Sequence, residues 1–155
     1  MIVPATIFLH SILLLLDNQL QGGVIKFKLS ALNLPSKDLN GLNDPYVQIF
    51  GKDSGTPFEK LGETLVTYGT INPDWDNVFQ FQFVKGIQQK WKFLVKDWDI
   101  GWNQDDVLGY VEISVDEVVS RMRKNGNGTL KSNKPITFSL SEPAGGVLVL
   151  YPVVE

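Results

Sequence analysis

The segment Lys96-Asp97-Trp98-Asp99-Ile100-Gly101-Trp102-Asn103-Gln104-Asp105-Asp106-Val107-Leu108-Gly109 lies between two apolar runs and contains four aspartates and two tryptophans. Placing four carboxylates in one short segment costs electrostatic repulsion unless a positive charge lies among them. Hard divalent cations prefer oxygen ligands, and Ca²⁺ tolerates irregular loop geometry better than Mg²⁺ does. The alternative is a solvated acidic turn, which explains one or two aspartates more readily than four.

Alternating apolar and polar residues on both sides of this segment predict β-strands. The clearest strand is 78–84, in which Phe79, Phe81 and Phe83 alternate with glutamines. The predicted strands are 24–34, 45–50, 63–68, 78–84, 90–95, 106–115, 135–140 and 147–154, and one helix is predicted at 116–124. Short strands separated by regularly spaced turns predict an all-β fold, an eight-stranded antiparallel Greek-key β-sandwich.

The composition is that of a globular protein and offers little catalytic equipment. The chain has 155 residues, 43% of them hydrophobic, with no cysteine and one histidine, His10. This length is most simply one domain. A catalytic triad or a zinc site built from several histidines is therefore not expected, and no nucleophile or phosphate-loop motif is present. We predict that the domain is not an enzyme.

Acidic residues are concentrated in three short segments, although the net charge is only −3. The eight residues concerned are Asp38, Asp44, Asp74, Asp76, Asp97, Asp99, Asp105 and Asp106. They leave nine acidic residues against 14 basic ones elsewhere, so the rest of the chain is mildly basic. Cations bound among these aspartates would reverse the local potential. No basic and aromatic cluster indicates nucleic-acid binding.

Residues 1–20 form an apolar N-terminal segment, and residues 21–155 form the predicted domain. The run from Ile7 to Leu16 is too short to span a bilayer. As a signal peptide it lacks a basic start and an obvious cleavage site. Three interpretations remain open: an element packed on the domain, a signal-like segment, or a tail that comes from an altered gene start or from cloning.

The acidic loops Asp38–Asp44, Asn72–Asn77 and Asp97–Asp106 are separated by one pair of strands each, so all three can lie at one end of a sandwich. Asp97 and Asp99 flank Trp98, and in extended geometry both point to one face. Carboxylates placed in this way suit Ca²⁺ coordination. An EF-hand is excluded, because Gly101 and Leu108 stand where that loop needs ligands.

In order and spacing, several segments of the chain resemble those of a C2 domain. They are Ala31-Leu32-Asn33-Leu34, Asp38, Asp44-Pro45-Tyr46-Val47, Asn72-Pro73-Asp74-Trp75-Asp76-Asn77-Val78-Phe79, Asp97-Trp98-Asp99 and Asp106-Val107-Leu108-Gly109. The resemblance covers about Gly22 to Glu155. Gly55–Glu63, Val115–Ser120 and Pro143–Val147 make the chain most similar to the first C2 domain of copines.

The resemblance implies an eight-stranded sandwich that binds Ca²⁺ in its loops and then docks on anionic phospholipid. It implies Asp38, Asp44, Asp97, Asp99 and Asp106 as ligands. Counted from Asp97, Asp105 has the spacing common in the family, so the choice between Asp105 and Asp106 stays open. Asp74 and Asp76 match a family loop that usually supplies no side-chain ligand, and we interpret them as turn residues.

Apolar residues beside the carboxylates predict a membrane contact. Leu42 in the first loop and Ile100 and Trp102 in the third stand at loop tips, and tryptophan prefers the bilayer interface. Burial of Trp102 against a neighbouring loop is the alternative. Trp98 is expected to pack at the end of the sandwich, and Trp75 and Trp91 in its core. A candidate cationic face for phosphoinositides comprises Lys26, Lys28, Lys90 and Lys92, with ordinary solvated sheet residues as the alternative.

The sequence therefore predicts a Ca²⁺-dependent module that binds anionic phospholipid membranes. It is expected to be cytoplasmic and to be recruited to membranes when Ca²⁺ rises, with protein partners left open. A Ca²⁺-independent C2-like scaffold for protein partners is the alternative.

Overall fold

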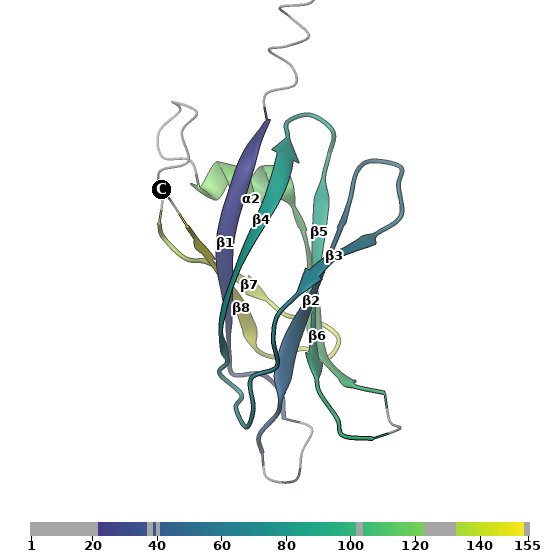
Figure 1. The fold of residues 1–155 in the computed structure, drawn as a ribbon, viewed down its shortest axis with the longest axis vertical. Helices are drawn as coiled ribbons and strands as arrows, with labels where there is room; N and C mark the ends of the chain where they lie inside the picture. Colours follow the sequence, from purple (N-terminus) through teal and green to yellow (C-terminus); the bar gives the residue numbers. More distant parts are fainter. Residues whose placement is uncertain (1–21, 37–38, 40, 102–103, 123–132, 154–155) are drawn as a thin grey trace, which may run out of the picture.

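The structure, a computed structural model, describes residues 22–36, 39, 41–101, 104–122 and 133–153. Within this part, two four-stranded antiparallel sheets pack face to face (Figure 1), which confirms the predicted fold class. The elements are β1 (Gly22–Leu32), β2 (Pro45–Lys52), β3 (Glu59–Glu63), β4 (Asp74–Val84), β5 (Lys90–Asp97), β6 (Asp106–Ser114), α2 (Val115–Met122), β7 (Ile136–Ser139) and β8 (Val147–Pro152).

Alternating apolar residues determine which face of each sheet points into the core. The first sheet has the order β4-β1-β8-β7 and the second the order β3-β2-β5-β6. Ile25, Phe27 and Leu29 of β1 are fully buried and face the second sheet, while the lysines between them are partly exposed. Period-two alternation thus places one face of each sheet in a shared core.

Aromatic rings fill the middle of the core. The ring centroid of Phe27 lies 5.4 Å from that of Trp91 and 5.7 Å from those of Phe79 and Phe81. Trp75 and Trp91 are 2% and 3% exposed, which confirms that both are core residues. Because Phe27 touches strands of both sheets, it joins the two layers.

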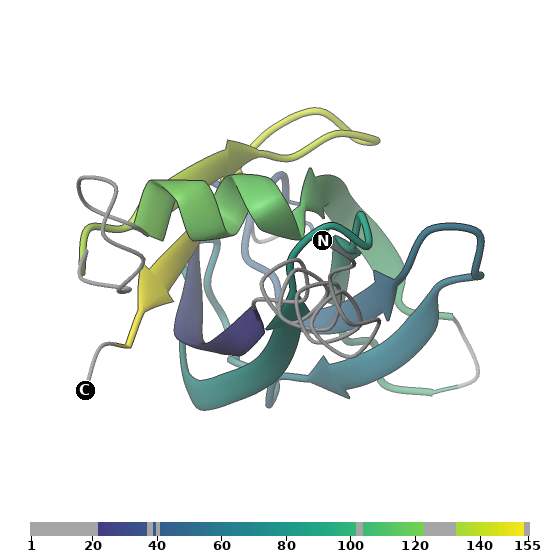
Figure 2. The same cartoon turned by 90° about the horizontal axis from the view of Figure 1, so that it is seen from above.

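Helix α2 lies at the end of the sandwich opposite the acidic loops (Figures 1 and 2). It packs Val115, Val118, Val119 and Met122 into the core and exposes its charged residues. The helix prediction is confirmed for 116–122, and residues 123–124 lie outside the described residues.

The predicted strand at 63–68 is wrong in position, because β3 is Glu59–Glu63. The β-branched residues of 64–67 favoured a strand. In the structure, the Thr64 N–H donates to Val47 O and the Thr67 N–H donates to Pro45 O, with no regular ladder between them. Side-chain and loop hydrogen bonds hold this segment against β2 in place of strand pairing.

Asp74 and Asp76 are strand residues, so their interpretation as turn residues is also wrong. Strand β4 begins at Asp74, where β1 pairs with it through Ser30. The buried indole of Trp75 donates to Pro45 O at 3.2 Å, and this hydrogen bond fixes the start of β4 against β2. Asp76 is exposed and lies 3.9 Å from Lys28 Nζ.

Gly109, which ends the Val-Leu-Gly motif, is required by packing. Its φ is +147°, and a Cβ added there would lie 2.9 Å from the Cβ of Leu140. The close approach lets the Tyr110 N–H donate to Ser141 O, which bridges the two sheets beside β7. Packing therefore explains the glycine of this motif without reference to any ligand.

The predicted apolar segment 1–20 lies outside the described residues. Among the residues that the structure does describe, no helix is long and apolar enough to span a membrane.

Replacing Phe27 with alanine should lower the free energy of unfolding by about 3–5 kcal/mol, because a fully buried ring leaves a cavity between the sheets. Val78→Ala in β4 is the matched control, since Val78 is 54% exposed. We expect the control to change stability by less than about 0.5 kcal/mol. Urea denaturation measures both values, and equal losses would contradict the central position of Phe27.

Candidate functional site

Three connections meet at one end of the sandwich, at the bottom of Figure 1. They join β1 to β2, β3 to β4, and β5 to β6. The strand register places their acidic residues side by side: Pro45 is the Cα partner of Asp97, and Asp97 is the Cα partner of Asp106. Aspartates far apart in the sequence therefore reach the same edge, the acidic end.

Asp44 and Asp97 are in direct contact at the acidic end. The Asp44 N–H donates to Asp97 Oδ1 at 2.6 Å, and the Trp98 N–H donates to Asp44 O at 3.0 Å. The Asp97 side chain is almost fully buried, at 2% exposure. A backbone N–H that donates to a buried carboxylate stabilises its charged form.

The connection between β3 and β4 is tied to the first loop by further hydrogen bonds. The Gly69 N–H donates to Asp44 Oδ1 at 2.7 Å, and the Thr70 N–H donates to Asn43 O at 2.8 Å. Asn43 is buried and its Nδ2 donates to Pro35 O. Asp44 thus links all three connections.

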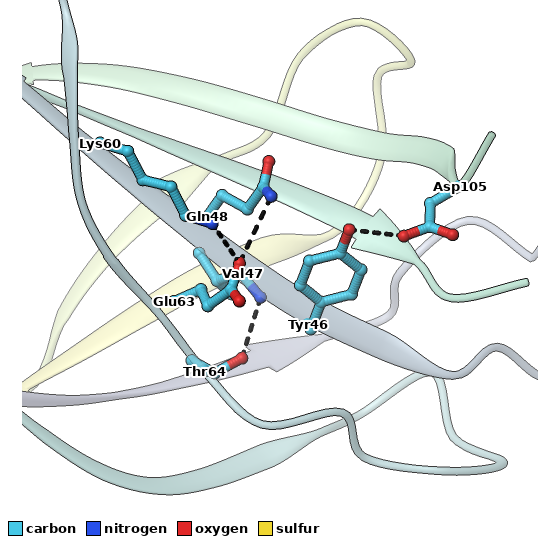
Figure 3. Close-up of polar contacts among 7 residues, drawn as sticks. All are labelled: Tyr46, Val47, Gln48, Lys60, Glu63, Thr64 and Asp105. Atoms are coloured by element: carbon cyan, nitrogen blue, oxygen red, sulfur yellow. Dashed lines mark hydrogen bonds and ion pairs between the residues drawn. The ribbon is translucent and has the colours of Figure 1, made fainter.

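Asp105 is held from two sides, and Figure 3 shows the contact with Tyr46. The Tyr46 hydroxyl donates to its Oδ2 at 2.6 Å, and the Asp99 N–H donates to its Oδ1 at 3.2 Å. The hydrogen bond from Tyr46 is the largest cause that lowers the pKa of the Asp105 carboxyl below its ordinary value. Burial, and then the hydrogen bond to Asp105, raise the pKa of the Tyr46 hydroxyl.

Asp106 is the most accessible of the predicted ligands that the structure describes, whereas Asp44, Asp99 and Asp105 are partly exposed. Asp99 is partly exposed, two residues beyond buried Asp97, and Asp106 is exposed at the first position of β6. Asp38 lies outside the described residues. The structure therefore brings five of the six predicted ligands to the acidic end.

Apolar side chains are exposed at the tips of the same connections. Ile100 is 86% exposed and Leu42 is 40% exposed. Leu39 is fully exposed in the first loop and was missed by sequence reasoning, although an apolar residue in a polar loop could have indicated it. Trp102 lies outside the described residues. Trp98 packs edge to face with Tyr68, with ring centroids 6.0 Å apart, as expected for the end of the sandwich.

The four predicted headgroup lysines do not form one cationic face. Lys26 and Lys28 alternate with the core residues of β1 and lie on the outer face of the first sheet. Lys90 and Lys92 alternate with Trp91 and Phe93 of β5 and lie on the outer face of the second sheet. The two pairs are therefore on opposite sides of the sandwich.

Register adds further lysines to the outer face of the second sheet. Lys52 is the Cα partner of Lys90, Lys60 is the Cα partner of Phe50, and Lys96 is the Cα partner of Tyr46. The resulting basic face consists of Lys52, Lys60, Lys90, Lys92 and Lys96. Glu63 contacts Lys60, and Glu112 lies 3.8 Å from Lys92, so two of its charges are partly balanced. Sequence reasoning missed three of these lysines because cross-strand partners depend on register.

The donors at the acidic end fit Ca²⁺ in their chemistry. They are carboxylate and backbone oxygens, the ligands that Ca²⁺ prefers. Within the part of the chain that the structure describes, no group of three or more Asp, Glu, His or Cys side chains is arranged to hold a metal ion. The carboxylates of Asp44, Asp97 and Asp105 instead accept hydrogen bonds from backbone N–H groups and, for Asp105, from Tyr46.

Comparison with known proteins identifies the fold family. The family model of the C2 domain matches residues 25–130 of this chain. The chain belongs to the C2 domain family. Mouse synaptotagmin-3 is 38% identical over 85 residues, which cover 54% of this chain and 14% of that protein. Mouse Ras GTPase-activating protein 4 is 30% identical over 98 residues, covering 63% of this chain and 11% of that protein. This C2 domain thus matches only a small part of either relative.

Solved C2 structures share the architecture. A C2 domain of plant extended synaptotagmin 1 is 27% identical with a TM-score of 0.59, over 86% of this chain and 97% of that one. A calcium-bound structure of two C2 domains of extended synaptotagmin 2 is 25% identical with a TM-score of 0.59. The match covers 84% of this chain and 45% of that one.

Asp97 should contribute to stability even in the presence of a chelator, because its carboxylate accepts the Asp44 N–H in a buried position. We expect Asp97→Ala to cost about 1–3 kcal/mol more than Asp97→Asn, since asparagine keeps an acceptor oxygen. Urea denaturation in chelator measures the difference. Equal stabilities of the two variants would show that this hydrogen bond makes no net contribution to the free energy of unfolding.

Proposed function

We propose that this C2 domain binds anionic phospholipid membranes in a Ca²⁺-dependent manner and has no catalytic role of its own. The observation that carries the proposal is the convergence of Asp44, Asp97 and Asp105 at one end, beside exposed apolar loop tips. The calcium-bound extended synaptotagmin 2 structure, with the same architecture, supports it.

In this proposal the ligands are Asp38, Asp44, Asp97, Asp99 and Asp106, with Asp105 as the sixth candidate. When bound, Ca²⁺ supplies positive charge and coordination positions that lipid phosphate oxygens can share. Without it, the aspartates repel anionic lipid. Their neutralisation lets the acidic end approach the headgroups.

The exposed loop tips add an apolar contribution. Leu42 and Ile100 project beside the aspartates, and Trp102 follows in the same connection. Burial of apolar side chains at the interface stabilises a bound state that salt does not screen. We propose a cytoplasmic domain that is recruited to membranes as Ca²⁺ rises. The similarity to the first C2 domain of copines stays a prediction.

Sedimentation with phosphatidylserine vesicles tests the switch. We expect the wild-type domain to bind in Ca²⁺ and not in chelator. Asp99→Asn should weaken Ca²⁺ binding, measured by calorimetry, by about tenfold or more, which corresponds to about 1.4 kcal/mol. Asp76→Asn is the matched control, because Asp76 is exposed on the outer face of β4 and pairs with Lys28.

Equal vesicle binding in Ca²⁺ and in chelator would contradict the Ca²⁺ switch. If calorimetry also detected no Ca²⁺ uptake, the Ca²⁺-independent scaffold for protein partners would become the better interpretation.

The basic face of the second sheet should supply a separate contact to phosphoinositides. A lysine near an anionic surface contributes about 1 kcal/mol. Replacing both Lys90 and Lys92 with alanine should therefore weaken binding to phosphatidylinositol bisphosphate vesicles roughly 5- to 30-fold. The double replacement of Lys26 and Lys28 is the control, since these lysines lie on the opposite face. Equal effects of the two double variants would show that the lysines act only through net charge.

A further inference from the structure

The hydrogen bonds of Asp105 join two elements that the chain separates. Its Oδ2 accepts from Tyr46 in β2, and its Oδ1 accepts from the Asp99 N–H within the same connection between β5 and β6. The second bond closes the connection across six residues. The first anchors this closure to a neighbouring strand.

The position of Tyr46 is set by its strand, β2, and not by the loop that it contacts. It is 8% exposed, follows Pro45 at the start of β2, and is the Cα partner of Lys96. Lys96 Nζ lies 5.9 Å from the centre of its ring. The next residue, Val47, is fixed by hydrogen bonds with Thr64 (Figure 3). The Tyr46 hydroxyl therefore has a fixed position, and its hydrogen bond to Asp105 positions that carboxylate relative to β2.

These two hydrogen bonds leave acceptor capacity on the Asp105 carboxylate. An ionised carboxylate offers about four lone-pair sites, and the hydrogen bonds from Tyr46 and Asp99 occupy two of them. Asp105 can thus close its connection and still present oxygen to a cation. A binding loop that is already ordered loses less conformational entropy when its ligand binds.

We propose that Tyr46 is a positioning residue for the acidic end: its hydroxyl holds Asp105 so that the connection between Asp97 and Asp106 is closed before Ca²⁺ binds. The part that concerns Ca²⁺ rests on the proposed function. The closure itself does not, because its hydrogen bonds are made by protein atoms alone.

Tyr46→Phe removes the hydroxyl and keeps the buried ring. Tyr151→Phe is the matched control, because Tyr151 lies in β8 of the other sheet, where its hydroxyl accepts a long 3.4 Å hydrogen bond from Ser30. Hydrogen exchange of the Asp99 amide, measured in chelator by NMR, reports the closure directly. We expect exchange about tenfold faster in Tyr46→Phe, with unchanged exchange in the paired interior of β5 and in the control.

Asp105→Ala tests whether Tyr46 acts through Asp105. This variant should also speed exchange of the Asp99 amide, and adding Tyr46→Phe to it should change nothing further. A separate, additive effect of Tyr46→Phe in the Asp105→Ala background would overturn the proposal, because it would show that the hydroxyl acts by another route.

Ca²⁺ titration by calorimetry provides the second measurement. We expect the Kd of Tyr46→Phe to rise about 3- to 10-fold and that of Tyr151→Phe to stay within about twofold of wild type. An unchanged or lower Kd for Tyr46→Phe would overturn its positioning role in Ca²⁺ binding. If the wild type bound no Ca²⁺, the proposed function would fail, and the exchange of the Asp99 amide would still decide whether Tyr46 closes the connection.

Discussion

The antiparallel pairing of β2 with β5 is the constraint on which the acidic end depends. Pairing Pro45 with Asp97 places the Asp44 N–H against the Asp97 carboxylate and sets Tyr46 within reach of Asp105. The pairing of β5 with β6 then continues the row to Asp106. A slip of one residue would turn every side chain of β2 to the other face. Core packing of β2 therefore also fixes the geometry of the aspartates.

The repulsion between the crowded carboxylates is offset by backbone N–H groups as well as by any cation. Asp44, Asp97 and Asp105 each accept a backbone hydrogen bond, from Gly69, Asp44 and Asp99 respectively. Hydrogen bonds to the ionised form stabilise it. This explains how hydrogen bonds within the protein can order the acidic end. It also means that Ca²⁺ binding would add to an existing network and would not have to create one.

Sequence patterns could predict the parts of the fold that depend on local alternation. The phenylalanines of β4 and the burial of Trp75 and Trp91 followed from period-two patterns and residue type. The prediction of a strand at 63–68 was wrong because β-branched residues favour a strand. In the structure, loop hydrogen bonds such as that of Thr64 hold this segment to β2. The role of Tyr46 could not be predicted, since its partner is 59 residues away and depends on register. The four lysines were assigned to one face because the alternation in β1 and β5 does not show that these two strands lie in different sheets.

The positions of the acidic end and the basic face constrain how the proposed membrane contacts combine. Lys96 and Tyr46 are cross-strand partners, and the next residue along β5 is Asp97, so the basic face begins where the acidic end stops. The exposed loop tips project from the acidic end, whereas Lys90 lies at the far end of β5. A flat membrane can therefore contact both surfaces only if the sandwich tilts toward the outer face of the second sheet. In such a tilt the lysines of β1, on the opposite face, turn away from the lipid.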